Sequence, residues 1–252
     1  MRLSDATKIM TGASEATKVY RGSEPVWLVG EDPANAWRPY CVSLLHFDGT
    51  DGSTIITDEI GKTWAANGHA QLDTSDKEFG SASLLCDANG DDYVSTPYSS
   101  DFAPGASDFT LDLRIKSPAF LVQGGMCGHN ELSDRGWSFN VPGGSKLRFT
   151  TNGGVALDCT YAFSTNTRYH AGIFGLSGKL YMYVDGVLLN EGGTPYSEIH
   201  DCGGFFVIGR AFADYAAAEE CFNGWIEEFR FLKGFADIYN LQNPPVGAYS
   251  LA

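Results

Sequence analysis

Apolar and polar residues alternate in many short runs of this chain. In the clearest run, Phe109–Ile115 (FTLDLRI), every odd position is apolar, and the positions between them include Asp112 and Arg114. In a β-strand, successive side chains point to opposite faces, so a pattern that repeats every two residues separates the two faces. We therefore predict a strand whose odd positions face a core and whose Asp112 and Arg114 lie on the other face.

A second pattern predicts a β-hairpin. Residues 180–184 (LYMYV) and 187–189 (VLL) are strand-like, and the Asp185-Gly186 pair between them is a strong two-residue turn signal. Tyr181 and Tyr183 share one face of the first strand, and the aliphatic residues share the other. We expect the aliphatic residues to pack in the core, so that the two tyrosines lie on the outer face. Further strands are expected over residues 93–96, 119–123, 136–141, 146–150, 168–174 and 205–209, and a helix of one or two turns over 211–221.

Many short strands joined by turns predict an all-β fold. The 30 glycines and 13% aromatic residues agree with this class, and one large sandwich can account for most of the 252 residues. No apolar run approaches the roughly 20 residues that span a bilayer. Residues 1–8 (MRLSDATK) lack the apolar stretch of a secretory signal, so we expect synthesis and folding in cytoplasm. The six scattered cysteines favour free, mostly buried thiols over three disulfides.

The charge is uneven along the chain and limits the possible partners. The chain has 31 acidic residues against 17 Lys or Arg, a net charge of −14. Residues 1–40 contain five of each kind, which leaves 26 acids and 12 bases in residues 41–252. Nucleic-acid binding requires a basic face to neutralise phosphates, so this acidic body argues against it. Divalent cations and glycans remain compatible with the charge.

The first 24 residues contain a ten-residue repeat, in which residues 5–14 (DATKIMTGAS) align with residues 15–24 (EATKVYRGSE). Each copy is a short strand followed by a glycine turn, which predicts a small β-hairpin or meander. Such an arm cannot bury a core alone and should dock on another surface. We expect an assembly arm and linker over residues 1–40, using Ile9, Val19, Tyr20 and Trp27, and one domain over 41–252. The alternative is an edge-strand decoration of the same domain.

The body resembles a known superfamily in the order of its pieces. Two glycine-punctuated runs, residues 44–53 (LLHFDGTDGS) and 224–234 (GWIEEFRFLKG), stand at its ends. Between them lie residues 79–84 (FGSASL), the run from Phe109 and the hairpin. Together these pieces resemble the laminin-G-like, concanavalin A-like lectin/glucanase superfamily, in its phage and bacterial branch. The resemblance implies a jelly-roll β-sandwich of two antiparallel sheets over residues 41–240.

The arm resembles N-terminal segments of phage tail and fibre proteins. The two resemblances together imply a non-enzymatic bacteriophage virion protein, anchored by its arm and displaying a lectin-like domain for host-surface glycan attachment. Such a protein would be made in the host cytoplasm and exposed on the particle surface. By analogy with its class, it would assemble as a symmetric oligomer, with a trimer as the expected state. The alternatives are a capsid decoration or head-fibre protein, and a bacterial carbohydrate-binding module.

Hydrolysis of glycans is disfavoured by the spacing of the carboxylates. Glycoside hydrolysis uses two carboxylates that flank the scissile bond, about 5–5.5 Å apart in retaining enzymes. The nearest candidate pairs are Glu227-Glu228 and Asp58-Glu59. Adjacent residues of a strand point to opposite faces, so neither pair predicts a catalytic dyad by itself.

A calcium site is an open alternative. Ca²⁺ prefers six to eight oxygen ligands from carboxylates and backbone carbonyls. Asp48 and Asp51 lie in one glycine-containing turn, and Glu228 on the closing strand is a candidate third ligand. The competing interpretation is that Asp48 caps a turn and Glu228 is solvated. Residues 87–92 (DANGDD) superficially resemble an EF-hand loop but lack its glycine and glutamate positions, so they are interpreted as a turn.

Glycan binding would use exposed aromatic rings together with polar groups. Tyr181, Tyr183 and Trp137 are the candidates for this role, although aromatic residues on strands more often belong to a core. His129 falls in a predicted loop, where recognition residues usually lie. His46 has apolar neighbours and is expected to be a structural histidine with a hydrogen-bond partner.

Overall fold

A computed structural model describes residues 18–21, 24–28, 34–87, 92–121, 124–131, 134–152, 154–211 and 221–251. The chain forms two compact units, Met1–Pro39 and Tyr40–Ala252. In the first unit, β1 (Lys18–Arg21) pairs with β2 (Glu24–Leu28) in an antiparallel hairpin. This hairpin joins the second repeat to the apolar run that follows it, with Val19 opposite Trp27. The first repeat, with Ile9, lies outside the described residues.

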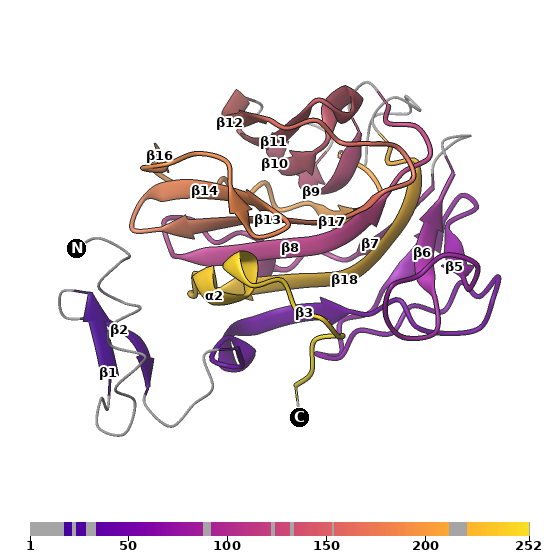
Figure 1. Cartoon of the computed structure of the whole chain (residues 1–252), viewed down its shortest axis with the longest axis horizontal. Helices are drawn as coiled ribbons and strands as arrows, with labels where there is room; N and C mark the ends of the chain where they lie inside the picture. The colour runs from indigo at the N-terminus through magenta and orange to yellow at the C-terminus, as the bar shows by residue number, and fades with distance from the viewer. Residues whose placement is uncertain are drawn as a thin grey trace. The chain divides into compact units, whose positions relative to one another are not determined.

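The second unit is a sandwich of two antiparallel sheets, as the sequence predicted (Figure 1). One sheet has seven strands, in the order β12 (Gly154–Thr160), β11 (Lys146–Thr151), β10 (Asp134–Asn140), β9 (Gly125–Glu131), β17 (Phe205–Ile208), β7 (Tyr93–Thr96) and β4 (Ala65–Asn67). The other has nine, in the order β15 (Val187–Leu188), β14 (Lys179–Val184), β13 (Arg168–Leu176), β8 (Phe109–Lys116), β18 (Gly224–Lys233), β6 (Ser83–Cys86) and β5 (Gln71–Asp73), with β16 (Thr194–Pro195) beside β14 and β3 (Cys41–Leu45) beside β18.

Short helical segments connect or follow the strands. The 3₁₀ turns are η1 (Arg38–Tyr40), η2 (Ser100–Phe102) and η3 (Pro142–Gly144), and helix α2 (Ile238–Gln242) follows β18. Among the described residues, no helix has the length and apolar character that a membrane span requires. The six cysteines are free thiols, and all except Cys41 are buried.

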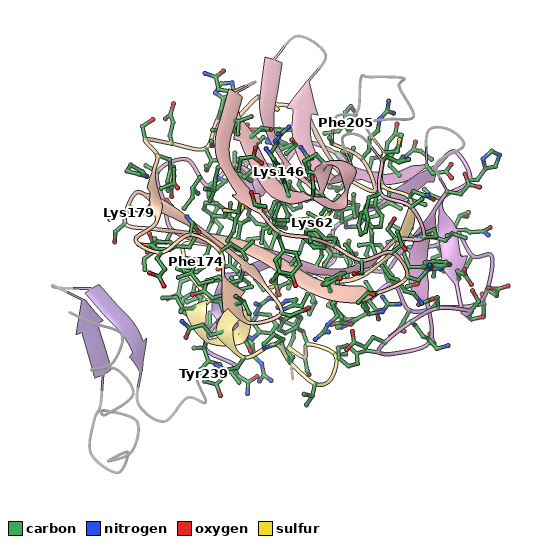
Figure 2. The ribbon with its side chains drawn as sticks, turned by 45° about the horizontal axis from the view of Figure 1, so that its top comes forward. Lys62, Lys146, Phe174, Lys179, Phe205 and Tyr239 are labelled. Atoms are coloured by element: carbon green, nitrogen blue, oxygen red, sulfur yellow. The ribbon has the colours of Figure 1, made fainter. Side chains whose placement is uncertain are left out.

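The core lies between the two sheets, where side chains fill the space (Figure 2). The four odd positions of β8 are all buried in it, as their alternation predicted. The hairpin of β14 and β15 also follows its pattern, because Leu180, Met182 and Val184 belong to this core. Aromatic rings stack at its centre: the ring of Phe206 lies 4.2 Å from that of Phe102, and 5.3 Å from that of Trp137.

The closing strand β18 lies in the middle of its sheet, between β8 on one side and β3 and β6 on the other. Phe229 of β18 is opposite Leu45 of β3, so the two glycine-punctuated runs at the ends of the body, residues 44–53 and 224–234, pair with each other. The pairing of β18 with β8 shifts register between Glu227 and Arg230, and Glu228 has a φ of 51°. A β-bulge of this kind re-aims the side chains around it.

Some expected elements differ from the structure. Residues 119–121 are not part of a strand, and the proposed helix over 211–221 falls mostly outside the described residues. The strands β9 and β12 had not been expected, because their sequences, GMCGHNE and GVALDCT, are rich in glycine and polar residues and lack a clear alternation.

Candidate functional site

The outer face of the nine-stranded sheet carries charged residues on strands that are otherwise apolar. Asp112, Arg114 and Lys116 alternate along β8, and Arg168 and His170 lie opposite Lys116 and Arg114 on β13. Directly opposite residues of an antiparallel pair share a face. The sheet therefore presents a charged row across two neighbouring strands, on the face away from the core.

Part of this row forms a buried ion cluster. Asp112 accepts hydrogen bonds from Arg230 Nε at 2.9 Å, from His170 Nε2 at 2.8 Å and from the Tyr249 hydroxyl. Arg230 also pairs with Asp237 Oδ2 at 2.7 Å. Burial alone would raise the pKa of Asp112, but the charges and hydrogen bonds of Arg230 and His170 outweigh burial and lower this pKa to about 2. Asp112 is thus held in its ionised form.

The segment after β18, residues 235–251, covers this cluster and is called the C-terminal strap. Its helix α2 lies against the nine-stranded sheet (Figure 1). The Tyr249 ring stacks on the Arg230 guanidinium at 4.0 Å, and the Tyr249 backbone N–H donates to Glu228 Oε2 at 2.9 Å. Arg114 donates to the backbone carbonyl of Pro245. The strap explains why Asp112 and Arg114 are buried although they lie on the outer face.

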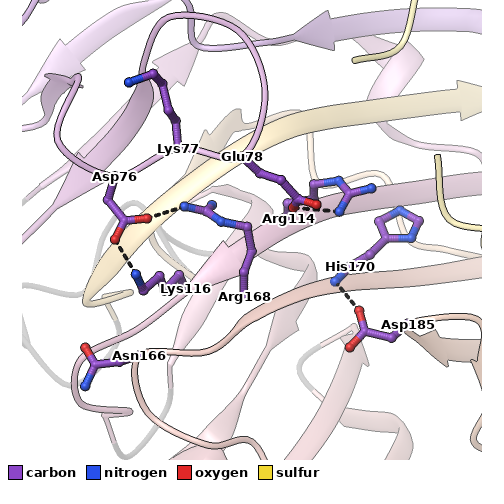
Figure 3. A pocket seen from close by; sticks show the side chains of 9 residues that line it. All are labelled: Asp76, Lys77, Glu78, Arg114, Lys116, Asn166, Arg168, His170 and Asp185. Carbon is purple, nitrogen blue, oxygen red and sulfur yellow. Dashed lines mark hydrogen bonds and ion pairs between the residues drawn. The ribbon is translucent and has the colours of Figure 1, made fainter. Parts of the chain in front are cut away.

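An open polar hollow of about 530 Å³ lies on the same face (Figure 3). Its floor is formed by β8 and β13, and its wall by the loop that precedes β6. It is lined by nine polar residues: Asp76, Lys77, Glu78, Arg114, Lys116, Asn166, Arg168, His170 and Asp185. Arg114 contributes to both the hollow and the anchoring of the strap, so the two features share one side chain.

Ion pairs fix the geometry of the hollow. The Asp76 carboxylate bridges Lys116 and Arg168, which face each other across β8 and β13. Arg168 also pairs with Glu227, and Arg114 Nη1 pairs with Glu78 Oε2 at 2.7 Å. Figure 3 shows the contacts that Asp76 and Glu78 of the loop make with the strands. Because Asp76, Glu78, Arg114, Lys116 and Arg168 are each held by a partner on another element, this part of the hollow is a preorganised polar surface.

The buried carboxylate of Glu227 holds the loop before β6 against the sheet. Glu227 accepts hydrogen bonds from the backbone N–H groups of Glu78 and Phe79, at 2.8 and 3.0 Å. Burial raises the pKa of Glu227, while these N–H donors and Arg168 oppose that effect. The loop that carries Asp76 and Glu78 is therefore tied to the sheet through its backbone.

The three candidate calcium ligands do not come together. The exposed Asp48 accepts from the Ser81 backbone N–H, and Asp51 accepts from the Thr74 backbone N–H at 3.1 Å. Glu228 is buried and binds His46 Nδ1 at 2.8 Å. Asp48 and Asp51 thus close loop contacts, and the ligand atoms of Asp48, Asp51 and Glu228 do not form a group within 4.8 Å of one another among the described residues. His46 is the bonded structural histidine that the sequence predicted.

Another group of potential ligands was missed by the sequence reasoning. In the part of the chain that is described, the side-chain ligand atoms of His69, Asp87 and Asp92 lie within 4.8 Å of one another. Asp92 is buried, and its oxygens already accept from the backbone N–H groups of His69 and Asp87 at 2.6 and 3.1 Å. This carboxylate ties two segments together, and residues 88–91 of the predicted turn lie outside the described residues.

The candidate glycan-binding aromatics lie in different environments. Trp137 is only 1% exposed, and its Nε1 donates to the Phe102 carbonyl, so it is a core residue and not the surface residue we expected. Tyr181 and Tyr183 form the outer row, as predicted. However, Tyr183 is buried with Phe174 and Leu241, because α2 covers that part of the sheet. Tyr181 is half-buried and stacks on Phe174 at 4.9 Å.

The carboxylate pairs also depart from the simple strand pattern. Adjacent residues of a regular strand point to opposite faces, but at the bulge the side chains of Glu227 and Glu228 do not follow this rule. Both are buried, and both hold segments that pack over the outer face. Asp58 accepts from the Ser43 hydroxyl at 2.6 Å and from Trp64 Nε1 at 3.0 Å. In this structure, Asp58, Glu227 and Glu228 are all engaged in hydrogen bonds.

The hollow itself was not predicted from the sequence. The available signal was the charged residues at alternate positions of apolar strands, namely Arg114 and Lys116 on β8 and Arg168 and His170 on β13. The loop that contributes Asp76 is about 40 residues away from β8 along the chain, as its contact with Lys116 shows. Only the fold brings these residues together.

Comparison with known proteins identifies the family. The family model described as the concanavalin A-like lectin/glucanases superfamily, Laminin_G_3, matches residues 88–235. This match covers more than half of the chain, which therefore belongs to that superfamily. No curated protein matches the chain significantly.

Several solved structures share the fold. The binding domain of paraclostridial mosquitocidal protein 1 is 14% identical, with a TM-score of 0.63 over 82% of this chain and 52% of that one. Domain 4 of AbnA, an extracellular arabinanase from Geobacillus stearothermophilus solved with arabinotriose, is 16% identical, with a TM-score of 0.57 over 81% and 97%. A Trypanosoma rangeli sialidase variant is 13% identical, with a TM-score of 0.56 over 84% and 34%. The chain thus spans about half the length of the first structure, and the neighbours include both binding domains and glycosidases.

Proposed function

We propose that the sandwich binds a host-surface glycan and that the chain is a non-enzymatic structural protein of a bacteriophage virion. The observation that carries the binding role is the polar hollow, with hydrogen-bond donors and acceptors fixed on β8, β13 and the loop before β6. Such a surface suits a ligand rich in hydroxyl groups, because its polar groups are already held in place before binding. The similarity to toxin binding domains and to an arabinanase domain supports this role at the level of the fold.

The virion part of the proposal is supported by the arm. Residues 1–40 resemble the N-terminal segments of phage tail and fibre proteins, and they fall almost entirely within a compact unit separate from the sandwich. In this proposal the first unit attaches the chain to other virion proteins, and the sandwich is displayed on the particle surface. A symmetric trimer is the expected assembly, and the protein would be made in the host cytoplasm.

Two other functions have an observation in their favour. The charged residues of the hollow already pair with one another, which would suit a capsid decoration or head-fibre protein that binds no sugar. The chain covers 97% of the arabinanase domain, which would suit a bacterial carbohydrate-binding module. Each of these becomes an outcome of the test that follows.

The test is a glycan array with the purified full chain, followed by localisation of the chain in imaged phage particles. We expect binding to a bacterial surface saccharide and a position at the tail or its fibres. Binding without any association with particles would favour the bacterial module. A position on the capsid without glycan binding would favour the decoration protein. Release of reducing sugar from a bound glycan would contradict the non-enzymatic assignment.

A further inference from the structure

We infer that the hollow selects an acidic saccharide, in which the sugar carries a carboxylate or a sulfate group, over a neutral one. This inference rests on the proposed glycan-binding function and specifies the chemical class of the ligand. It comes from the distribution of charge over the sandwich and from the arrangement of cations across β8 and β13.

The hollow concentrates the few basic residues of an acidic domain. Residues 41–252 contain 26 acids and only 12 Lys or Arg. Four of these 12 line the hollow, together with three acids, so the ratio of charges there differs from that of the rest of the domain. An anionic ligand is repelled by most of this surface, and the basic lining gives it a local place to bind.

The two central cations form a pair that needs an anion. Lys116 and Arg168 are directly opposite in the register of β8 and β13. Like charges at such positions repel each other because their side chains share a face. The Asp76 carboxylate, which comes from the loop, lies between them and contacts both. Arg168 has a second partner in Glu227, whereas Lys116 has Asp76 as its ion-pair partner. The two strands therefore build a site for a negatively charged oxygen.

Donors remain available for a ligand at this site. A lysine ammonium has three N–H donors and a guanidinium has five. Lys116 contacts one oxygen of Asp76, and its side chain is 23% exposed. Lys77 is exposed, its Nζ donates to the neutral Thr74 carbonyl at 2.8 Å, and it forms no ion pair among the described residues. An acid group on a sugar would bind to Lys116 and Arg168 beside Asp76, with Lys77 at the rim.

The remaining lining residues suit the sugar ring. Asn166 and Asp185 are exposed at the opposite rim from the loop, and Asp185 is fixed by the His170 backbone N–H at 2.8 Å. The amide of Asn166 can donate to and accept from sugar hydroxyl groups, and the carboxylate of Asp185 can accept from them. The site thus offers cations for the acid group and neutral or acidic partners for the hydroxyls.

The experiment compares four probes by calorimetry with the full chain: a uronate oligosaccharide, a sulfated oligosaccharide, a neutral β-glucan oligosaccharide and a short DNA duplex. We expect both acidic saccharides to bind at least about tenfold more tightly than the neutral one, because hydrogen bonds to charged groups are the stronger kind. Their affinity should fall as NaCl is raised from about 50 to about 300 mM.

The variant Lys116→Gln should weaken binding of the acidic saccharides by about tenfold, and should weaken any binding of the neutral saccharide by less. The variant Lys77→Gln, on the exposed loop, gives the same test with less risk to folding. The matched control is Lys146→Gln, because Lys146 also pairs with an aspartate, Asp158, but on the other sheet. Thermal unfolding of each variant confirms that it is folded.

The outcomes separate the two proposals. Equal or tighter binding of the neutral saccharide would overturn the acidic class and leave glycan binding intact. Absence of binding to any saccharide would overturn the proposed function. Binding of the DNA as tightly as the acidic saccharides, with the same loss in Lys116→Gln, would show a general anion site and overturn saccharide selection.

Discussion

Asp112 and Arg230 show how charged residues on a strand come to be fully buried. Both lie on the outer face of the nine-stranded sheet, yet neither side chain is exposed. Each is satisfied by several partners, which include His170, Asp237 and Tyr249. A buried ion pair gains little over apolar packing, but removal of one partner leaves an uncompensated charge. The cluster is therefore sensitive to single substitutions.

The substitution Asp112→Asn tests this sensitivity. We expect it to lower the free energy of unfolding by about 3–5 kcal/mol, because Arg230 and His170 lose a shared carboxylate. Chemical denaturation measures the change. The control is Asp158→Asn, whose partners Lys146 and Arg148 are partly exposed, and which should cost about 1 kcal/mol or less. Similar small losses in both variants would contradict the prediction.

The pair of His46 and Glu228 should make stability depend on pH. The hydrogen bond to Glu228 raises the pKa of His46 above 6.5. A raised pKa means that protonated His46 favours the folded state. This contribution is complete below pH 6.5 and is lost as the pH rises through the folded-state pKa. The substitution His46→Gln should therefore destabilise the protein more at pH 6 than at pH 9, in thermal unfolding. An equal loss at both pH values would contradict the assignment.

At the scale of elements, the hairpin of β14 and β15 meets the C-terminal strap. Its turn residues, Asp185 and Gly186, have φ angles of 48° and 82°, which the two-residue turn requires. A Cβ on Gly186 would lie 2.8 Å from the backbone oxygen of Gln242 at the end of α2. The turn and the strap are packed too closely for any side chain at this position.

We expect Gly186→Ala to lower the free energy of unfolding by more than the backbone strain alone, which is about 1–3 kcal/mol. The matched control is Gly192→Ala, because Gly192 has a φ of 83° with nothing within 4 Å of its added Cβ. Chemical denaturation gives the free energy of unfolding of each variant, and the difference between the two variants measures the effect of the steric clash with the strap. A loss in Gly192→Ala as large as in Gly186→Ala would show that the strap contact is unimportant.

The elements also show what a sequence can predict here. The alternation in β8 predicted its two faces, and the Asp-Gly turn predicted the hairpin, because both signals are local. The burial of Asp112 and Tyr183 depends on the strap, and the hollow depends on Asp76, which is far away in the chain. The bulge at Glu228 breaks the period of two, so the rule of alternating faces failed there. Nonlocal packing is what the sequence pattern lacks.

At the scale of the whole molecule, the two compact units should act separately. Removal of residues 1–39 should leave the sandwich folded, because its core and both of its sheets lie within Tyr40–Ala252. The same deletion should abolish incorporation into particles if the arm is the anchor. Thermal unfolding of the shortened chain and its co-purification with particles measure the two effects. Incorporation at the normal level would contradict the role of the arm.

The central place of β18 has a consequence for synthesis. This strand is the last of the sandwich to leave the ribosome, yet it fills the gap between β8 and the strands β3 and β6. Until residue 233 has emerged, the edge of β8 remains open to other chains, and an open edge invites intermolecular pairing. Nascent copies that stall before this point should therefore be aggregation-prone, and chaperone capture of truncated chains should end abruptly once β18 is complete.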